Sequence, residues 1–171
     1  MKALICNEFG STKNLTLEEV KSPEPGAGQV LIDVHAAGIN FPDVLTVQGK
    51  YQFKPSLPFT PGIEVSGVIK KVGKDVKMRK VGDEVISTLQ TGAFASEVVT
   101  SENSTFLKGN MSFEQAAGFA LTYGTSYYAL KQRARLVAGE TVLVLGAAGG
   151  VGVATIQLAK AMGANVIAAA S

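Results

Sequence analysis

The hydrophobic pattern along this chain changes from short strand-like runs to helical periodicity. From Met1 to about Gly109, apolar runs of strand length alternate with stretches containing Gly and Pro. Seven short strands at this spacing indicate a β-barrel or sandwich. The predicted strands are Lys2–Cys6, Leu15–Val20, Gln29–Ala36, Ile63–Val72, Glu84–Gln90, Phe94–Thr100 and Thr105–Leu107.

Helical spacing appears in two places outside these strands. A short helix is predicted over Asn40–Gln48, followed by an extended loop over Tyr51–Gly62 that contains three prolines. A longer helical segment begins at Ser112, which forms a capping box with Gln115. Glycines within this segment predict a break near Tyr123–Thr125 before Tyr127–Lys131 resumes the helix.

The last part of the chain reads as one βαβ unit. Thr141–Leu145 is an apolar, β-branched run that is typical of a strand buried on both faces of a parallel sheet. A glycine-rich turn leads into a helix, and Asn165–Ala170 reads as the next strand. One helix face is predicted from apolar and small residues at helical spacing: Val151, Ala154, Thr155, Leu158, Ala159 and Met162.

The turn between the first strand and the helix has the pattern A-x-G-x-x-G, in which Ala147 replaces the first glycine of a dinucleotide fingerprint. Glycines allow a pyrophosphate to approach the backbone, and the helix N-terminus offers unpaired N–H donors. The alternative is a turn that exists for packing alone. The predicted phosphate contacts are Ala148, Gly149, Gly150, Val151 and Gly152.

The residue that reads the ribose 2′ position lies about 20 residues beyond such glycines, which places it at or just past Ser171. A small hydroxyl residue there permits a 2′-phosphate, whereas an acidic residue would repel it. A complete doubly wound domain needs several more strands. We therefore expect the chain to be a fragment or a truncated gene product.

Composition and charge narrow the function classes. The 171 residues carry a net charge of +2, and the basic residues concentrate only in Lys70–Lys80. That run favours a solvated turn over a nucleic-acid patch, because aromatic residues are not interleaved with it. The single cysteine, Cys6, lies in an apolar run that predicts a buried, inert thiol. Without a visible signal peptide or membrane-length apolar run, we expect a cytoplasmic protein.

Several collinear motifs carry a family resemblance. The chain resembles the medium-chain dehydrogenase/reductase superfamily in its zinc-free quinone oxidoreductase branch. The matching stretches are Gln29–Asp43, Pro58–Gly73, Val81–Val85, Ala116–Leu130 and Ala147–Gly152. The resemblance implies a fold of mixed α+β and α/β class: a GroES-like β-barrel catalytic domain over residues 1–122, without its C-terminal return segment. Residues 123–171 would open a truncated Rossmann domain.

The resemblance also implies a chemistry. Zinc-dependent relatives place Cys and His at the positions of Asn40 and Ile63, so no metal site is expected here. The implied reaction is hydride transfer from NADPH to a quinone or an α,β-unsaturated carbonyl, with a homodimer as the full-length form. Such an acceptor is already electrophilic, so the protein has to position it and stabilise the developing enolate. The alternative is a catalytically silent interaction module.

Candidate site residues outside the glycine turn follow from this chemistry. The amide of Asn40 can donate to a carbonyl oxygen or serve the cofactor, although a turn role before Pro42 is the alternative. Tyr51 is either a hydroxyl donor at the pocket or a loop-packing residue. Thr125 matches a nicotinamide contact of relatives, or is a helix-break hydroxyl bonded to its own backbone. Asp43 and Glu64 receive no acid–base role; each could orient neighbours or cap turns. His35 is expected to be structural.

Overall fold

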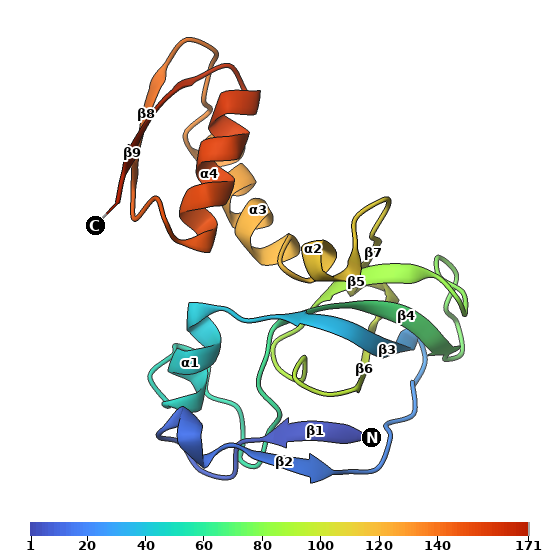
Figure 1. Cartoon of the computed structure of the whole chain (residues 1–171). Helices are drawn as coiled ribbons and strands as arrows, with labels where there is room; N and C mark the ends of the chain where they lie inside the picture. Colours follow the sequence, from blue (N-terminus) through green and yellow to red (C-terminus); the bar gives the residue numbers. More distant parts are fainter. Residues whose placement is uncertain (171) are drawn as a thin grey trace. The chain divides into compact units, whose positions relative to one another are not determined.

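The computed structural model describes residues 1–170, and the chain folds into two units, Met1–Gly118 and Phe119–Ser171. Figure 1 shows the elements of each unit. Unit 1 is built from antiparallel strands with two short helices, and unit 2 contains helices and a pair of parallel strands. Ser171, the residue expected at the ribose 2′ position, lies outside the described residues.

Unit 1 contains a five-stranded antiparallel sheet with the order β6-β3-β4-β5-β7. A separate antiparallel pair, β1–β2, is joined to the rest of the unit by bridges from Ala3 to Ala95 and from Cys6 to Phe59. The predicted strand-rich domain is therefore confirmed. The strands are β1 (Lys2–Ile5), β2 (Thr16–Glu19), β3 (Gln29–Gly38), β4 (Glu64–Val72), β5 (Glu84–Thr88), β6 (Glu97–Ser101) and β7 (Thr105–Leu107).

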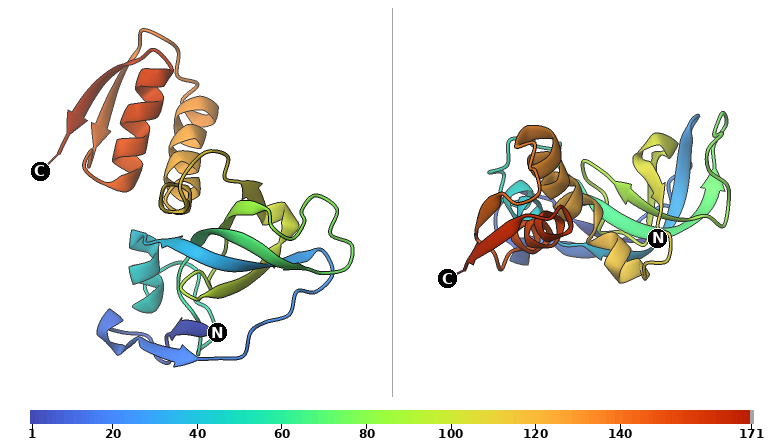
Figure 2. Two further views of the ribbon diagram at one scale, coloured as in Figure 1. Left: turned by 45° about the vertical axis from the view of Figure 1, so that its right-hand side comes forward. Right: turned by 90° about the horizontal axis from the view of Figure 1, so that it is seen from above.

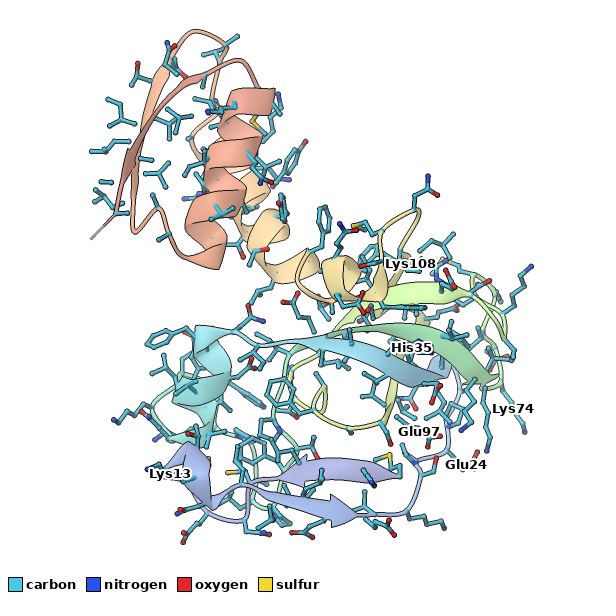
Figure 3. All side chains as sticks on the ribbon, in the orientation of Figure 1. Lys13, Glu24, His35, Lys74, Glu97 and Lys108 are labelled. Atoms are coloured by element: carbon cyan, nitrogen blue, oxygen red, sulfur yellow. The ribbon has the colours of Figure 1, made fainter. Side chains whose placement is uncertain are left out.

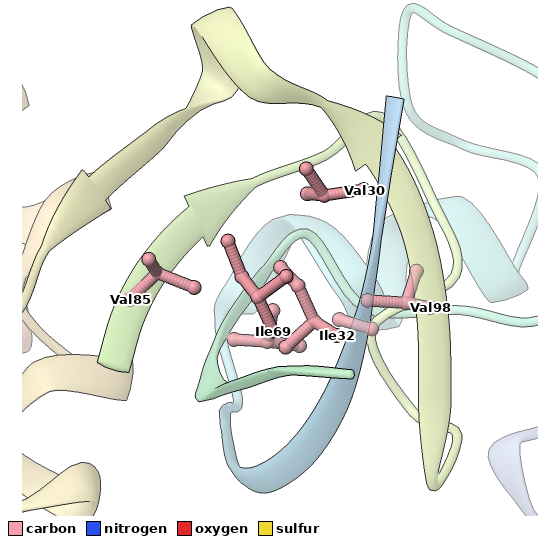
Figure 4. Close-up of a cluster of buried hydrophobic side chains, with 7 residues drawn as sticks. Val30, Ile32, Ile69, Val85 and Val98 are labelled. Carbon is pink, nitrogen blue, oxygen red and sulfur yellow. The ribbon is translucent and has the colours of Figure 1, made fainter. Parts of the chain in front are cut away.

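The core of unit 1 lies between the curved strands, where β-branched side chains pack together (Figure 4). Its fully buried members come mainly from alternate positions of β3 and β4, as period-2 patterning requires. The cluster consists of Val30, Ile32, Val65, Ile69, Val85, Ala93 and Val98. Cys6 is buried elsewhere, beside Val47 and Phe59, and desolvation raises the pKa of its thiol. The inert thiol expected from the sequence is consistent with this position.

The pairing of β3 with β4 contains two register shifts, one between Leu31 and Ile32 and one between Val34 and Ala36. Such bulges bend a strand and change the alternation of its side chains. Beyond the second shift, β3 continues to Gly38, and α1 (Phe41–Val47) begins almost at once, with Asn40 as its N-cap. The predicted short helix is thus confirmed, and a loop without regular secondary structure follows it.

The helical segment that begins after Ser112 differs from the prediction. Helix α2 (Phe113–Ala117) ends at Gly118, whose backbone leaves the helical region (φ −98°, ψ 9°). Helix α3 (Ala120–Tyr127) then runs without interruption through Tyr123–Thr125, so the predicted break there is wrong. Gly124 is tolerated inside the helix, and the chain continues directly into a π-helical segment, η3 (Tyr128–Arg133). The glycine that interrupts this helical segment is Gly118, between α2 and α3.

Unit 2 confirms the predicted βαβ order: β8 (Thr141–Leu145), α4 (Gly150–Ala161) and β9 (Asn165–Ala169). The two strands pair in parallel, with Leu143 opposite Ile167. Helices α3 and α4 lie side by side in both views of Figure 2. One member of the predicted inner face of α4 is misplaced, since Val151 is 45% exposed, whereas Ala154 and Ala159 are buried.

One face of the β8–β9 pair is apolar and exposed in this chain. Leu143, Leu145 and Ile167 are 59%, 75% and 56% exposed, whereas Val144 on the other face is buried. The sequence predicts burial on both faces, and only one is covered. Exposed apolar strands of this kind promote pairing with other chains.

We therefore expect the 171-residue chain to self-associate, with a mass above that of a monomer in light scattering. Leu145→Lys should shift the chain toward monomer, because a charge on this face opposes its burial. Leu17→Lys is the matched control, since Leu17 is also an exposed strand residue (69%) but lies on β2. A monomeric wild-type chain, or an equal effect of both substitutions, would contradict this assignment.

Candidate functional site

Asn40 lies at the junction of β3 and α1, and two acidic side chains bind it. Its backbone N–H donates to Asp43 Oδ2 at 2.7 Å, and its side-chain Nδ2 donates to Glu64 Oε1 at 2.9 Å. Asp43 is the N3 residue of α1, where a carboxylate completes a capping box. The predicted turn role and a ligand-binding role are compatible, because the half-buried side chain keeps a second N–H.

Asp43 and Glu64 are both buried, with exposed fractions of 3% and 1%. Among the described residues, Asp43 Oδ1 has no hydrogen-bond partner. Desolvation raises the pKa of Asp43 to about 6; the hydrogen bond from Asn40 opposes the rise, and the charge of Glu64 adds to it. Local spacing predicts Asp43 as a cap, but nothing local connects Asn40 with Glu64, which is distant in the sequence.

Asn40 is flanked in the sequence by two exposed apolar residues. Its neighbours Ile39 and Phe41 are 82% and 73% exposed. Tyr51 is half-buried and lies beyond the other end of α1, where its backbone N–H donates to the Leu45 carbonyl at 3.2 Å. A seven-residue helix is about 10 Å long. The structure thus joins Asn40 to two carboxylates and places Tyr51 at the opposite end of α1.

Asn40 and Ile63, the two positions compared above with the ligands of zinc-dependent relatives, carry side chains that bind metal ions poorly or not at all. Ile63 directly precedes Glu64, and its side chain offers no donor atom. Within residues 1–170, no three His, Cys, Asp or Glu side chains are grouped to hold a metal ion. His35 belongs to β3, and its ring packs on Phe113 with a centroid distance of 4.3 Å. Figure 3 labels His35 on this strand, and the packing agrees with a structural role.

The glycine turn of unit 2 forms a close contact between β8 and α4. Gly146 has a left-handed backbone (φ 65°), and α4 begins after the N-cap Gly149. A Cβ at Gly152 would collide with the Gly146 carbonyl oxygen and lie 2.8 Å from Ala147 Cα. The packing role of this turn is therefore real. It is compatible with the predicted phosphate binding, because the first N–H groups of α4 have no partner within the helix.

Helices α3 and α4 are joined by the hydroxyl groups of Ser126, which the sequence analysis did not name, and of Thr155, which it named only as part of the helix face. Ser126 Oγ lies 2.8 Å from the Thr122 carbonyl oxygen and 3.1 Å from that of Val151, and Thr155 Oγ1 lies 3.0 Å from Ser126 Oγ, all within hydrogen-bond distance. Ser126 is buried, whereas its neighbour Thr125 is exposed. Because α3 does not break here, the helix-break role considered for Thr125 has no structural basis. Its exposed hydroxyl is compatible with a ligand contact.

Several cations of the basic run bind neighbouring groups. Lys70 pairs with Glu97 at 2.5 Å, and Lys71 pairs with Glu24 at 2.7 Å; Figure 3 labels both glutamates. Arg79 donates to Thr105. The run covers the end of β4 and the connection to β5, which agrees with the predicted solvated turn except that Lys70 and Lys71 belong to the strand. In the part of the chain that the structure describes, no helix has the length and apolar character needed to cross a membrane.

Comparison with known proteins gives a consistent result. Residues 26–136 match the family model described as "Alcohol dehydrogenase GroES-like domain". The chain is 45% identical over 172 residues to "Quinone oxidoreductase-like protein 2 homolog" of Nematostella vectensis, covering 98% of this chain and 47% of that protein. The chain thus spans about half the length of the curated relatives it matches.

Solved structures agree with these sequence matches. The human synaptic vesicle membrane protein VAT-1 homolog-like protein superposes with a TM-score of 0.97 at 36% identity, over 100% of this chain and 56% of that one. The quinone oxidoreductase of Thermus thermophilus, solved also in complex with NADPH, gives a TM-score of 0.88 at 35% identity, over 100% and 54%. The predicted fold, a GroES-like domain followed by the start of a Rossmann unit, is confirmed.

The contact at Gly152 predicts the effect of a single methyl group on the stability of unit 2. We expect Gly152→Ala to destabilise this unit by about 1–3 kcal/mol, the usual cost of overpacking. Gly149→Ala is the matched control: its Cβ would lie 3.4 Å from the Gly146 oxygen, an ordinary contact, and its φ of −78° suits alanine. Tyrosine fluorescence during urea unfolding measures this, because three of the four tyrosines are in unit 2. Equal stabilities of both variants would refute the prediction.

The raised pKa of Asp43 predicts a pH dependence of unit 1. The folded state binds a proton at Asp43 that the unfolded chain binds only near pH 4, so this contribution to stability is lost as the pH rises through about 6. Between pH 7 and pH 5, the free energy of unfolding should rise by about 1 kcal/mol through this group. The pKa values of Glu18, Glu97 and Glu114 are lowered in the folded chain. Their contributions to the pH dependence of stability therefore lie below pH 5.

Asp43→Asn should abolish this rise, whereas Asp75→Asn should retain it. Asp75 is an exposed aspartate in the left-handed region (φ 64°), which asparagine also adopts. Urea unfolding at pH 5, 6 and 7, followed through the NMR signals of unit 1, measures the difference. The same rise in Asp43→Asn as in the wild-type chain would rule out Asp43 as its source.

Proposed function

We propose that the full-length protein is a metal-independent oxidoreductase, because this chain belongs to the alcohol dehydrogenase GroES-like domain family. Within the medium-chain dehydrogenase/reductase superfamily, it belongs to the quinone oxidoreductase branch. The proposed reaction is hydride transfer from NADPH to a quinone or an α,β-unsaturated carbonyl. The observation that carries this proposal is the amide of Asn40, which Glu64 holds in place and which two exposed apolar residues flank in the sequence. It combines a polar donor with flanks that suit an apolar acceptor.

The role proposed for Asn40 is to donate its second side-chain N–H to the acceptor carbonyl, whose oxygen gains negative charge as a hydride arrives. A donor that is already oriented costs no reorganisation when the charge develops. Exposed Ile39 and Phe41 would contact an apolar ring and exclude water from it. Since Asn40 and Ile63 replace the metal ligands of zinc-dependent relatives, the proposal uses no metal.

The residues of the glycine turn fit a dinucleotide cofactor. The narrow contact at Gly152 brings the turn against α4, so the N-terminal N–H groups of a twelve-residue helix are presented at its end. We assign the pyrophosphate to Ala148–Gly152 and a contact with the nicotinamide to Thr125, all in unit 2. When bound, NADPH supplies the hydride. Ser171 is proposed to accommodate the 2′-phosphate, and Tyr51 to donate a hydroxyl to the acceptor.

The decisive experiment uses this chain extended past Ser171 to the length of its relatives. We expect it to oxidise NADPH in the presence of a quinone or an enone, with the same rate after treatment with a chelator. Wild-type protein should prefer NADPH to NADH, and Ser171→Asp should lower kcat/KM for NADPH selectively through charge repulsion. Ser171→Thr, which keeps the hydroxyl, is the control.

The possible outcomes separate the parts of the proposal. Loss of turnover with the chelator would contradict metal independence. An unchanged NADPH/NADH ratio in Ser171→Asp would remove Ser171 from the 2′-phosphate site. A folded extended chain without turnover on any quinone or enone would instead support the silent interaction module.

A further inference from the structure

Glu64 is a buried carboxylate that binds the residue proposed to meet the substrate. It is 1% exposed at the start of β4, and its Oε1 accepts the Asn40 Nδ2 hydrogen bond at 2.9 Å. Its backbone is fixed on both sides, because β4 pairs Glu64 with Gly38 of β3 and with Thr88 of β5. A side chain on a central strand of a sheet has little freedom to move, so the position of this acceptor is set by the fold.

Gly38 provides the space for this carboxylate. A Cβ at Gly38 would lie 2.5 Å from Glu64 Oε1 and 2.5 Å from the carbonyl oxygen of Ala117. Any larger residue would displace the acid or the backbone at the end of α2. Glycine at the end of β3 therefore allows a charged group to lie beside the strand that leads to Asn40.

The chemistry of the two groups decides how the amide is oriented. An ionised carboxylate only accepts hydrogen bonds, whereas an asparagine amide has an NH2 end and an oxygen end. The NH2 end of Asn40 must therefore face Glu64. In the flipped orientation two oxygens would face each other and repel. One N–H then remains for a ligand, and its direction is fixed by the bond that the other N–H makes.

Asp43 holds the same residue by its backbone. Its Oδ2 accepts the Asn40 N–H at 2.7 Å, so acidic groups from α1 and β4 bind two different donors of one residue. The backbone bond places Asn40 at the start of α1, and the side-chain bond orients its amide. Hydrogen bonds to charged acceptors are stronger than those between neutral groups.

We propose that Glu64 is a positioning residue that orients the Asn40 amide so that its free N–H faces the reacting carbonyl group. This inference rests on the proposed function. It assigns to Glu64 no proton transfer and no contact with the substrate. The charge and position of Glu64 act only through the orientation of Asn40.

The first test needs no activity and uses the 171-residue chain. In ¹H–¹⁵N NMR spectra, one side-chain amide proton of Asn40 should be shifted downfield by the carboxylate. Glu64→Gln should decrease that shift, because a neutral amide oxygen is a weaker acceptor than a carboxylate. The backbone amide of Asn40, bound to Asp43, should change little. Glu102→Gln is the matched control, because Glu102 is also a buried carboxylate but binds the backbone N–H groups of Lys77 and Met78.

Two results of this test decide the structural part of the inference. An Asn40 side-chain signal that is the same in wild type and Glu64→Gln overturns the proposal. Where Glu64→Gln fails to fold, Glu64→Asp replaces it, since the shorter side chain keeps the charge but withdraws the acceptor. The downfield shift should then decrease, and its persistence overturns the proposal.

The second test is a double-mutant cycle on the extended chain. Glu64→Gln should lower kcat about 10-fold, the factor that corresponds to one hydrogen bond of ordinary strength, with little change in KM for NADPH. Asn40→Ala should lower kcat at least as much. The double variant should be no slower than Asn40→Ala, because a residue that acts only through Asn40 has no effect once that amide is gone. Glu102→Gln should leave kcat unchanged.

The two tests fail in distinguishable ways. Multiplicative effects in the cycle overturn the positioning role, because Glu64 would then act independently of Asn40. Full turnover in Asn40→Ala contradicts the proposed function of Asn40 and removes the catalytic consequence of its orientation. The NMR result in that case still reports on the orientation itself.

Discussion

The antiparallel pairing of β3 with β4 is the constraint on which unit 1 depends. These strands contribute Val30, Ile32, Val65 and Ile69 to the buried cluster. On its other side, β3 pairs with β6, and β4 pairs with β5. The same pairing sets Gly38 opposite Glu64. The burial of the core and the placement of the acid beside Asn40 are therefore two results of one register. A shift of this register would expose apolar side chains of the core. It would also separate Glu64 from Asn40.

The buried acids around Asn40 illustrate how such a site balances cost and precision. Two carboxylates removed from water are unfavourable, and one oxygen of Asp43 has no partner among the described residues. The cost is reduced by hydrogen bonds from Asn40 to both acids. What the arrangement provides is a polar donor of defined orientation, between two exposed apolar residues of the chain, Ile39 and Phe41. A flexible asparagine on an exposed loop would have to lose its rotamer freedom upon each binding event.

Much of this fold could be predicted from the sequence, because local patterns determine it. Period-2 alternation gives the strands of unit 1, and the apolar run before the glycine turn gives β8. The break predicted at Tyr123–Thr125 was wrong, because glycine content alone does not show which glycine ends a helix. The C-cap of α2 is Gly118. In the site, the spacing of Asn40 and Asp43 suggests a cap. The bond between Asn40 and Glu64 joins residues far apart in sequence, and only the β3–β4 register brings them together.

The division into two units has a consequence for how the chain unfolds. Unit 1 has its own buried cluster within a five-stranded sheet, whereas the strands of unit 2 form a single pair with one uncovered apolar face. Cooperative unfolding of a whole chain requires its parts to be coupled and of similar stability. Amide hydrogens of β8 and β9 should therefore exchange with solvent through partial openings that leave β3 and β4 protected. For such a chain, a single melting temperature describes neither unit, and stability becomes a property of each segment.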